Sequence, residues 1–120
     1  MAGIAAAGAL PRPAPGMLGE TSPALDALVR AVAHPDMADL SMRQAALLAV
    51  LRTAPEPERH VKRLAARLAV NKPAITRGMD RLEELKFARR QADRTDKRNC
   101  ICVITPPGRA WLRRLEGAVA

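Results

Sequence analysis

The side chains with the clearest chemistry in this chain gather in two basic places of its second half. One set falls on the outward face of a helix predicted at about 72–86, and the other falls in a turn at 93–98. Arginine suits a guanine edge, threonine suits a thymine methyl group, and cations neutralise phosphates. The pattern therefore predicts nucleic-acid contacts by Lys72, Ala74, Thr76, Arg77 and Arg81 of the helix and by Arg94, Lys97 and Arg98 of the turn.

Two short helices joined by a tight turn are predicted to present the first set. Apolar residues recur at helical spacing over His60–Ala69 and over Lys72–Lys86. Asn71 stands where its side chain can cap the second helix, and Pro73 falls in the first turn, where no backbone N–H is needed. Ala65 provides the small side chain that two crossing helices require. This is the sequence form of a helix-turn-helix, whose second helix fits the DNA major groove.

A two-stranded hairpin with a basic tip is predicted to follow the second helix directly. Phe87–Ala92 and Asn99–Thr105 alternate as strands do, and Asp93–Arg98 supplies turn-forming residues and cations. A basic hairpin in this position is typical of a wing, which reaches the adjacent minor groove or the DNA backbone. The hairpin favours DNA contact over the alternative, in which the helix is an ordinary solvated surface.

The charge distribution points to the same segment. The 120-residue chain carries a formal net charge of +8 and is long enough for one domain with a modest core. Residues 1–58 carry a net charge of −2, whereas residues 59–120 hold sixteen Lys and Arg against six acids. The positive charge thus lies where phosphates are predicted to bind. A membrane is not expected as a partner, because no basic amphipathic helix with bulky aromatic anchors is evident.

Three further helices are predicted around an aliphatic core, at Ser22–His34, Met42–Arg52 and Pro106–Val119. We interpret Gln44 as a helix-surface residue. Trp111 fits either an anchor in a subunit interface or a core residue under the wing.

Residues 1–21 are rich in Ala, Gly and Pro, so we expect a disordered tail ahead of a domain that spans 22–120. The predicted fold class is mainly α with a small β hairpin (α+β), arranged as a winged helix-turn-helix.

Cys100 and Cys102 could do sulfur chemistry. They alternate with Ile104 on the strand face expected to pack inward, so we interpret both as small buried hydrophobic residues. A redox switch is the alternative. Residues two apart on a strand lie about 6.6–7 Å apart, however, at the edge of what a disulfide spans.

No motif typical of catalysis or of a cofactor is evident in the sequence. It has no glycine-rich phosphate loop and no Ser/His/Asp or Cys/His set. His34 and His60 have no Cys or acid at ligand spacing, so we expect helix-end residues rather than a metal site. The apolar run near the start is too short for a transmembrane helix and lacks the cationic flank of a signal peptide. We therefore expect a cytoplasmic protein that is no enzyme and holds no cofactor or metal.

One long stretch, LAARLAVNKPAITRGMDRLEELKFARRQADRTDKRNCICVITPPG, resembles the MarR family of winged helix-turn-helix regulators. It shares the family's leucine-alanine helix, its recognition helix and, most specifically, its D-x-x-D-[RK]-R wing. PAITR alone also resembles the recognition helix of LysR-type regulators, which precedes a long effector domain. The MarR resemblance implies that Asp96 braces an arginine and that DNA faces Asn71, Lys72, Pro73, Ala74, Thr76, Arg77, Lys97 and Arg98.

The resemblance also implies an oligomer. In the resembled family the first helix belongs to a dimer interface, and a long C-terminal extension interlocks with the partner. This sequence ends about where that extension would begin, so we expect a homodimer that is less tightly held. An effector pocket forms beside the interface in relatives, which makes a small-molecule effector a candidate partner.

We therefore predict a sequence-specific regulator of transcription that binds double-stranded DNA and represses by occluding a promoter. One alternative is an RNA-binding or ribosome-associated winged helix, which would hold structured RNA against competing duplex DNA. Another is a protein-interaction winged helix, whose basic face would contact an acidic partner and leave DNA untouched.

Overall fold

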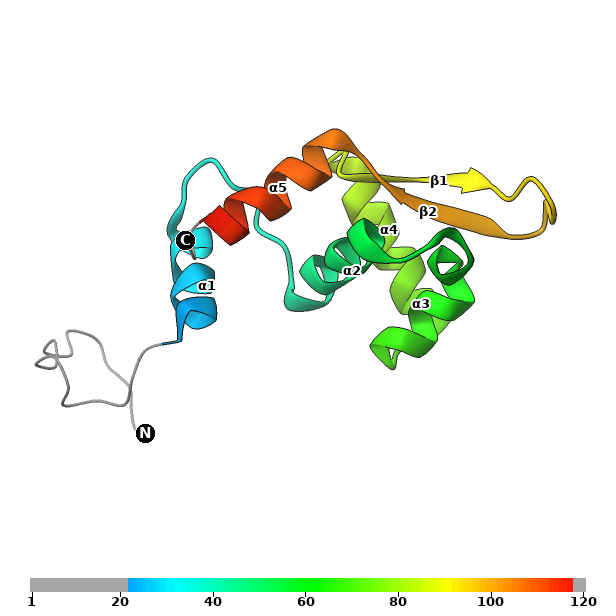
Figure 1. The fold of residues 1–120 in the computed structure, drawn as a ribbon, viewed down its shortest axis with the longest axis horizontal. Helices are drawn as coiled ribbons and strands as arrows, with labels where there is room; N and C mark the ends of the chain where they lie inside the picture. The colour runs from blue at the N-terminus through cyan, green and yellow to red at the C-terminus, as the bar shows by residue number, and fades with distance from the viewer. Residues whose placement is uncertain (1–21, 118–120) are drawn as a thin grey trace, which may run out of the picture.

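The computed structural model describes residues 22–117, which form helices and one antiparallel hairpin (Figure 1). The fold class predicted from the sequence, mainly α with a small β hairpin, is confirmed. The predicted tail at 1–21 lies outside the described residues, as do the last residues of the final predicted helix. The elements are α1 (Pro23–Ala33), α2 (Met42–Thr53), the 3-10 helix η1 (Glu56–Arg59), α3 (Val61–Leu68), α4 (Lys72–Glu84), β1 (Ala88–Ala92), β2 (Cys100–Ile104) and α5 (Pro106–Gly117).

Helix α4 supplies the centre of the core. Its inward residues Ile75, Met79 and Leu82 are each 0% exposed, and they belong to one apolar cluster with side chains of α2, α3, the hairpin and α5. This is the stripe that the sequence predicts. Gly78 lies against α2, where an added Cβ would stand 3.1 Å from Leu47 Cδ2, so a glycine lets the two helices approach closely.

The hairpin projects from the helices as an arm (Figure 1). Its strands pair in antiparallel register from Ala88 opposite Ile104 to Ala92 opposite Cys100. His60, just before α3, forms an isolated bridge with Ile101, so the hairpin has a third backbone neighbour at its middle. The root of the arm packs in the core, whereas its tip stands in solvent.

The two cysteines of β2 differ from the expectation that both are buried. Cys102 is 0% exposed, but Cys100 is exposed, because the core ends before the last residue pair of the hairpin. Ile101 is buried on the opposite face, where His60 bridges to it. Burial raises the pKa of the Cys102 thiol to about 11, so this thiol stays protonated and unreactive near neutral pH.

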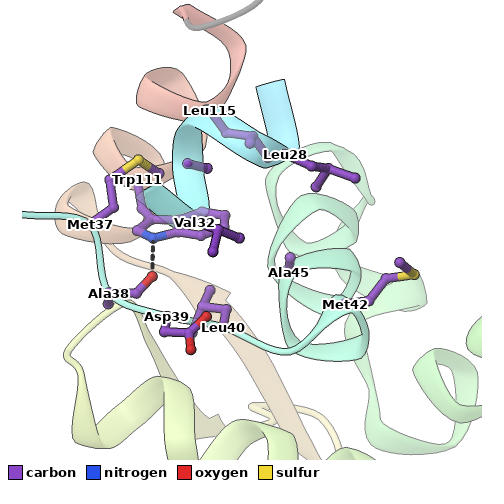
Figure 2. A pocket seen from close by; sticks show the side chains of 11 residues that line it. Leu28, Val32, Met37, Ala38, Asp39, Leu40, Met42, Ala45, Trp111 and Leu115 are labelled. Atoms are coloured by element: carbon purple, nitrogen blue, oxygen red, sulfur yellow. Dashed lines mark hydrogen bonds between the residues drawn. The ribbon is translucent and has the colours of Figure 1, made fainter. Parts of the chain in front are cut away.

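Trp111 of α5 is a core residue, as one of its two interpretations predicts. Figure 2 shows its side chain beside the loop before α2. Its indole Nε1 donates a hydrogen bond to the Ala38 carbonyl at 3.0 Å, and its ring centroid lies 6.4 Å from that of Phe87. A buried indole N–H normally requires such a partner. Trp111 thereby fastens the loop between α1 and α2 to α5.

Helix α1 has little contact with this core. Only Ala27 of the helix is buried, against the end of α5, while the predicted apolar stripe of α1 is largely in solvent. Within residues 22–117, no helix is long and apolar enough to cross a membrane. In the same part of the chain, no three His, Cys, Asp or Glu side chains are grouped so that they could hold a metal ion.

Candidate nucleic-acid interface

The turn between α3 and α4 fixes the start of the candidate recognition helix. Ala69 adopts a left-handed conformation with φ of 56°, and the next amide, of Val70, donates to the Ala65 carbonyl at 3.0 Å. The left-handed Ala69 and this hydrogen bond end α3 directly after Leu68. Asn71 then caps α4, because its Oδ1 accepts a hydrogen bond from the Ala74 amide at 2.9 Å, as predicted. Pro73 occupies the first turn of α4, also as predicted.

The outward face of α4 presents most of the predicted residues to solvent. Lys72, Pro73, Thr76 and Arg77 are exposed. Among the described residues, neither Lys72 nor Arg77 forms an ion pair, so both cations are available to an anionic partner. Arg81 is half-buried, and its Nη1 lies 2.5 Å from Glu84 Oε1.

Ala74 has the helical phase of this outward face but is not exposed. It is 7% exposed, and the prediction of its placement is therefore wrong. Ala74 and Gly78, one turn apart, line a groove between α4 and the start of α2, together with Arg77 and Ser41–Gln44.

Gln44 has a role that the surface interpretation missed. Its Oε1 accepts a hydrogen bond from the Ser41 amide at 2.9 Å, and its own amide donates to Ser41 Oγ at 3.0 Å. These reciprocal bonds form a capping box at the start of α2. The spacing of Ser and Gln three residues apart was the sequence signal for it.

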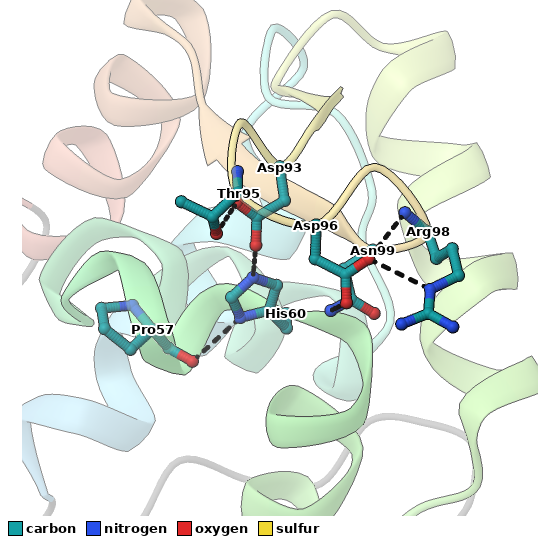
Figure 3. A network of polar contacts seen from close by, with 7 residues as sticks. All are labelled: Pro57, His60, Asp93, Thr95, Asp96, Arg98 and Asn99. Atoms are coloured by element: carbon teal, nitrogen blue, oxygen red, sulfur yellow. Dashed lines mark hydrogen bonds and ion pairs between the residues drawn. The ribbon is translucent and has the colours of Figure 1, made fainter.

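The tip of the hairpin carries the second set of cations. Arg94, Lys97 and Arg98 are exposed. Asp96 lies between them, and its Oδ1 accepts from the Arg98 backbone N at 3.1 Å and from Arg98 Nε at 3.2 Å (Figure 3). Asn99 Nδ2 donates to the other oxygen of Asp96 at 3.2 Å. The carboxylate is thus used within the turn, while the Arg98 side chain remains 91% exposed.

An ion-pair group that the sequence did not reveal holds the hairpin against α4. Arg90 of β1 pairs with Glu83 and also donates to Asp80 Oδ1 at 2.6 Å. The Arg90 amide donates to Glu83 Oε2 at 2.9 Å. Hydrogen bonding by the Arg90 guanidinium lowers the pKa of the Glu83 carboxyl below its ordinary value. Two acids of α4 are therefore engaged by the hairpin and not by the cations of the outward face.

A second unpredicted contact holds the tip. Asp93 is the one charged residue described as buried, with 8% exposure. Its Oδ1 accepts from the Thr95 amide and hydroxyl, both at 2.9 Å, and its Oδ2 lies 2.9 Å from His60 Nε2. Hydrogen bonds from the Thr95 amide, and next from His60, lower the pKa of Asp93 to about 2. His60 does stand at a helix end, but it has an acid partner that sequence spacing could not indicate.

This geometry agrees with a comparison of the sequence with protein families. Residues 38–99, more than half of the chain, match the sequence model of the MarR family. The chain belongs to the MarR family. By sequence alone, no curated protein matches this MarR-family chain.

Solved structures of MarR-type regulators share its fold. CouR bound to a 23-mer DNA duplex has 26% identity and a TM-score of 0.67, over 81% of this chain and 64% of CouR. A cysteine-to-serine mutant of MarR from E. coli complexed with operator DNA has 27% identity and a TM-score of 0.63, over 68% and 57%. PcaV from Streptomyces coelicolor, in complex with its natural ligand, has 21% identity and a TM-score of 0.61, over 67% and 55%. The chain thus spans less than two thirds of the length of each.

The link between α4 and the hairpin predicts a stability effect with a matched control. Replacing Glu83 by Gln removes the charge that Arg90 binds, and should lower the free energy of unfolding by about 1–2 kcal/mol at neutral pH. Glu84→Gln changes the neighbouring carboxylate, which is 69% exposed, and should cost less than about 0.5 kcal/mol. Urea titration followed by circular dichroism measures both.

The same pair predicts a pH dependence. Because the pKa of Glu83 is lowered in the folded protein, its stabilising contribution is present above the ordinary value of 4.5 and is lost as pH falls through the folded pKa. The difference in the free energy of unfolding between the wild type and Glu83→Gln should therefore become smaller as the pH falls. Equal stability losses for both glutamate variants at neutral pH would contradict the assigned link.

Proposed function

We propose that this chain is a transcriptional regulator that binds double-stranded DNA in a sequence-specific way and represses by occluding promoter DNA. The observation that carries the proposal is Arg77, which is exposed in the middle of α4 and forms no ion pair among the described residues, in the same fold as a hairpin tip with three exposed cations. A guanidinium in that position can read a guanine edge while the tip holds the backbone. CouR and MarR, which share the fold, were solved with DNA.

The proposal assigns contacts by element. We propose that Asn71, Lys72, Pro73, Thr76, Arg77 and Arg81 of the helix-turn-helix and Arg94, Lys97 and Arg98 of the wing face DNA, with Asp96 shaping the wing turn. The proposal treats 22–120 as one DNA-binding domain. It includes no catalytic reaction, cofactor or metal, and it keeps the cytoplasm as the location, because the protein must reach its DNA.

The two kinds of cation should respond differently to mutation. Arg77→Ala should weaken the cognate site by about 1–3 kcal/mol and relax base preference, because a base-reading contact is lost. Lys97→Ala should weaken binding to the cognate and the scrambled duplex equally. The log–log salt slope of the wild type should be on the order of −5 per subunit, and Lys97→Ala should reduce its magnitude by about one. Arg113→Ala is the control: it removes an exposed cation of α5 and should change neither the affinity for DNA nor the salt slope.

Fluorescence anisotropy measures these affinities. The duplexes come from the region upstream of the protein's own reading frame, with a scrambled duplex and structured RNA as competitors. A nearly flat salt response, or RNA that displaces every duplex, would remove the proposal. Equal weakening of both duplexes by Arg77→Ala would make Arg77 a phosphate contact and move specificity elsewhere.

We further propose that the working form is a homodimer paired through α1. Leu25, Leu28, Val29 and Val32 of α1 are 42–77% exposed, which is unusual for four large apolar side chains on one short helix. A second copy offers an equally apolar face, and two-fold pairing sets two recognition helices about one DNA turn apart.

A charge placed in that face should break the pairing. Val29→Glu should shift the protein from dimer to monomer at micromolar concentrations, because the pairing would bury a carboxylate. Ala66→Glu is the control, since Ala66 is an exposed residue of α3 and not of α1. Sedimentation velocity reports the state of each. A wild-type monomer that also binds DNA one to one would defeat the dimer proposal.

A small apolar effector is proposed as a further partner. A cavity of about 290 Å³ lies between α1, the loop before α2, and α5, with Leu28, Val32, Met37, Leu40, Trp111 and Leu115 among its lining residues (Figure 2). This is close to the size of small-molecule sites. PcaV was solved with its natural ligand. Trp111, the one tryptophan of the chain, should report occupancy by a change in fluorescence, and a library of apolar acids and phenols that leaves it unchanged would count against the effector.

A further inference from the structure

The imidazole of His60 connects the wing to the helix-turn-helix (Figure 3). His60 is the residue just before α3, and Asp93 is the first residue after β1. The Asp93 carboxylate uses one oxygen to hold the Thr95 amide and hydroxyl and the other to meet His60 Nε2. The Asp93 amide also donates to the Asn99 carbonyl at 3.0 Å, which closes the base of the tip. The wing turn is therefore tied to the helices through one side-chain contact.

Both ring nitrogens of His60 face acceptors. Nδ1 lies 3.1 Å from the Pro57 carbonyl oxygen and Nε2 lies 2.9 Å from Asp93 Oδ2. A carbonyl oxygen and an ionised carboxylate have no proton to donate, so each contact requires an N–H from the ring. A neutral imidazole has one N–H, and only the imidazolium has two. The geometry is complete only in the charged form.

We propose that His60 is a positioning residue which holds the wing most firmly while its imidazole is protonated, so that DNA affinity falls as this proton is lost. The affinity part rests on the proposed DNA-binding function, whereas the positioning part does not. Loss of the proton leaves either the Pro57 carbonyl or the Asp93 carboxylate without a donor. Where the remaining N–H stays on Nε2, the charged His60–Asp93 pair becomes a weaker hydrogen bond from a neutral donor, and where it moves to Nδ1 the contact with Asp93 is lost. In both cases the tip that carries Arg94, Lys97 and Arg98 is held less firmly, and its cations meet phosphates at a larger entropic cost.

The charged surroundings of His60 favour the imidazolium. The hydrogen bond to the Pro57 carbonyl contributes most to raising the pKa of His60, followed by the hydrogen bond to Asp93. Burial opposes them, and the negative charges of Asp93 and of Glu56 in η1 each raise the pKa by less than burial lowers it. Other charged groups near His60 have partners of their own. Glu58 Oε2 of η1 lies 3.9 Å from Arg63 Nη1 of α3. Arg59 Nη1 donates to the Cys102 carbonyl of β2 at 3.5 Å. Those two cations are thus held by other groups.

The direction of the pH effect follows from that raised pKa. A raised folded-state pKa means that the contribution of His60 is fully present below the ordinary imidazole value of 6.5 and is lost as pH rises through the folded value. Asp93, with its pKa lowered to about 2, stays ionised across the whole range in which His60 titrates. The wing should therefore be held in mildly acidic solution and released in mildly alkaline solution.

The first test needs no DNA. In the free protein, NMR titration of the ring should give His60 a pKa above about 6.5, and Asp93→Asn should lower it. Heteronuclear 15N NOEs of the Thr95 and Asn99 amides should fall across the same midpoint, as the tip gains picosecond-to-nanosecond motion. Unchanged NOEs across that midpoint, or a neutral His60 at about pH 6, would overturn the positioning role whatever the protein binds.

The second test measures duplex affinity at constant ionic strength between about pH 6 and about pH 8. Wild-type affinity should fall on the order of tenfold, since no more than one proton per subunit is linked. His60→Gln should have a flat profile near the weak, alkaline wild-type value. His34→Gln removes the one other imidazole of the chain, in an exposed residue at the end of α1, and should keep the wild-type profile.

The effect of Lys97→Ala at each pH separates positioning from a simple charge effect. If His60 positions the wing, Lys97→Ala should weaken binding at the acidic end and lose most of its effect at the alkaline end. If His60 were itself a phosphate contact, the effect of Lys97→Ala would be the same at the two pH values, and the proposal would be overturned. Absence of DNA binding at every pH would defeat the proposed function, and the NMR result would still decide the positioning role.

Discussion

The buried stripe of α4 is the constraint on which the rest of the structure depends. Ile75, Met79 and Leu82 are fully buried, and each contributes about 1.5–3 kcal/mol by leaving water. A helix fastened along one face has no freedom to rotate, so the residues on the side opposite the stripe must face outward. For that reason, the Arg77 side chain faces solvent. The same helix also carries the acids that hold Arg90, so the placement of the wing follows from the placement of α4.

Much of this fold could be predicted because its signals are local. The stripe of α4, the Asn71 cap and the alternation of the hairpin each depend on residues a few positions apart, and the structure reproduces them with small shifts at the ends. The family likewise follows from one continuous stretch. The contacts of individual side chains with DNA remain predictions.

What the sequence did not reveal depends on contacts between distant elements. His60 and Asp93 are 33 positions apart and meet only after the hairpin folds back over η1. Ala74 has the right helical phase for the outward face, but it is buried beside the start of α2, and periodicity within one helix contains no information about a neighbour. Cys100 shares a face with Cys102 yet lies beyond the reach of the core, because alternation predicts a side and not a depth.

The central claim is that the outward face of α4 and the wing tip form one DNA-binding surface. An NMR titration of the 15N-labelled protein with duplex DNA at low salt tests it most directly, because every amide reports its own surroundings. The account predicts shift changes grouped at 71–81 and 94–99, with the amides of α1 and of the second half of α5 little affected. Changes grouped on α1 and α5, or no changes at all, would contradict it.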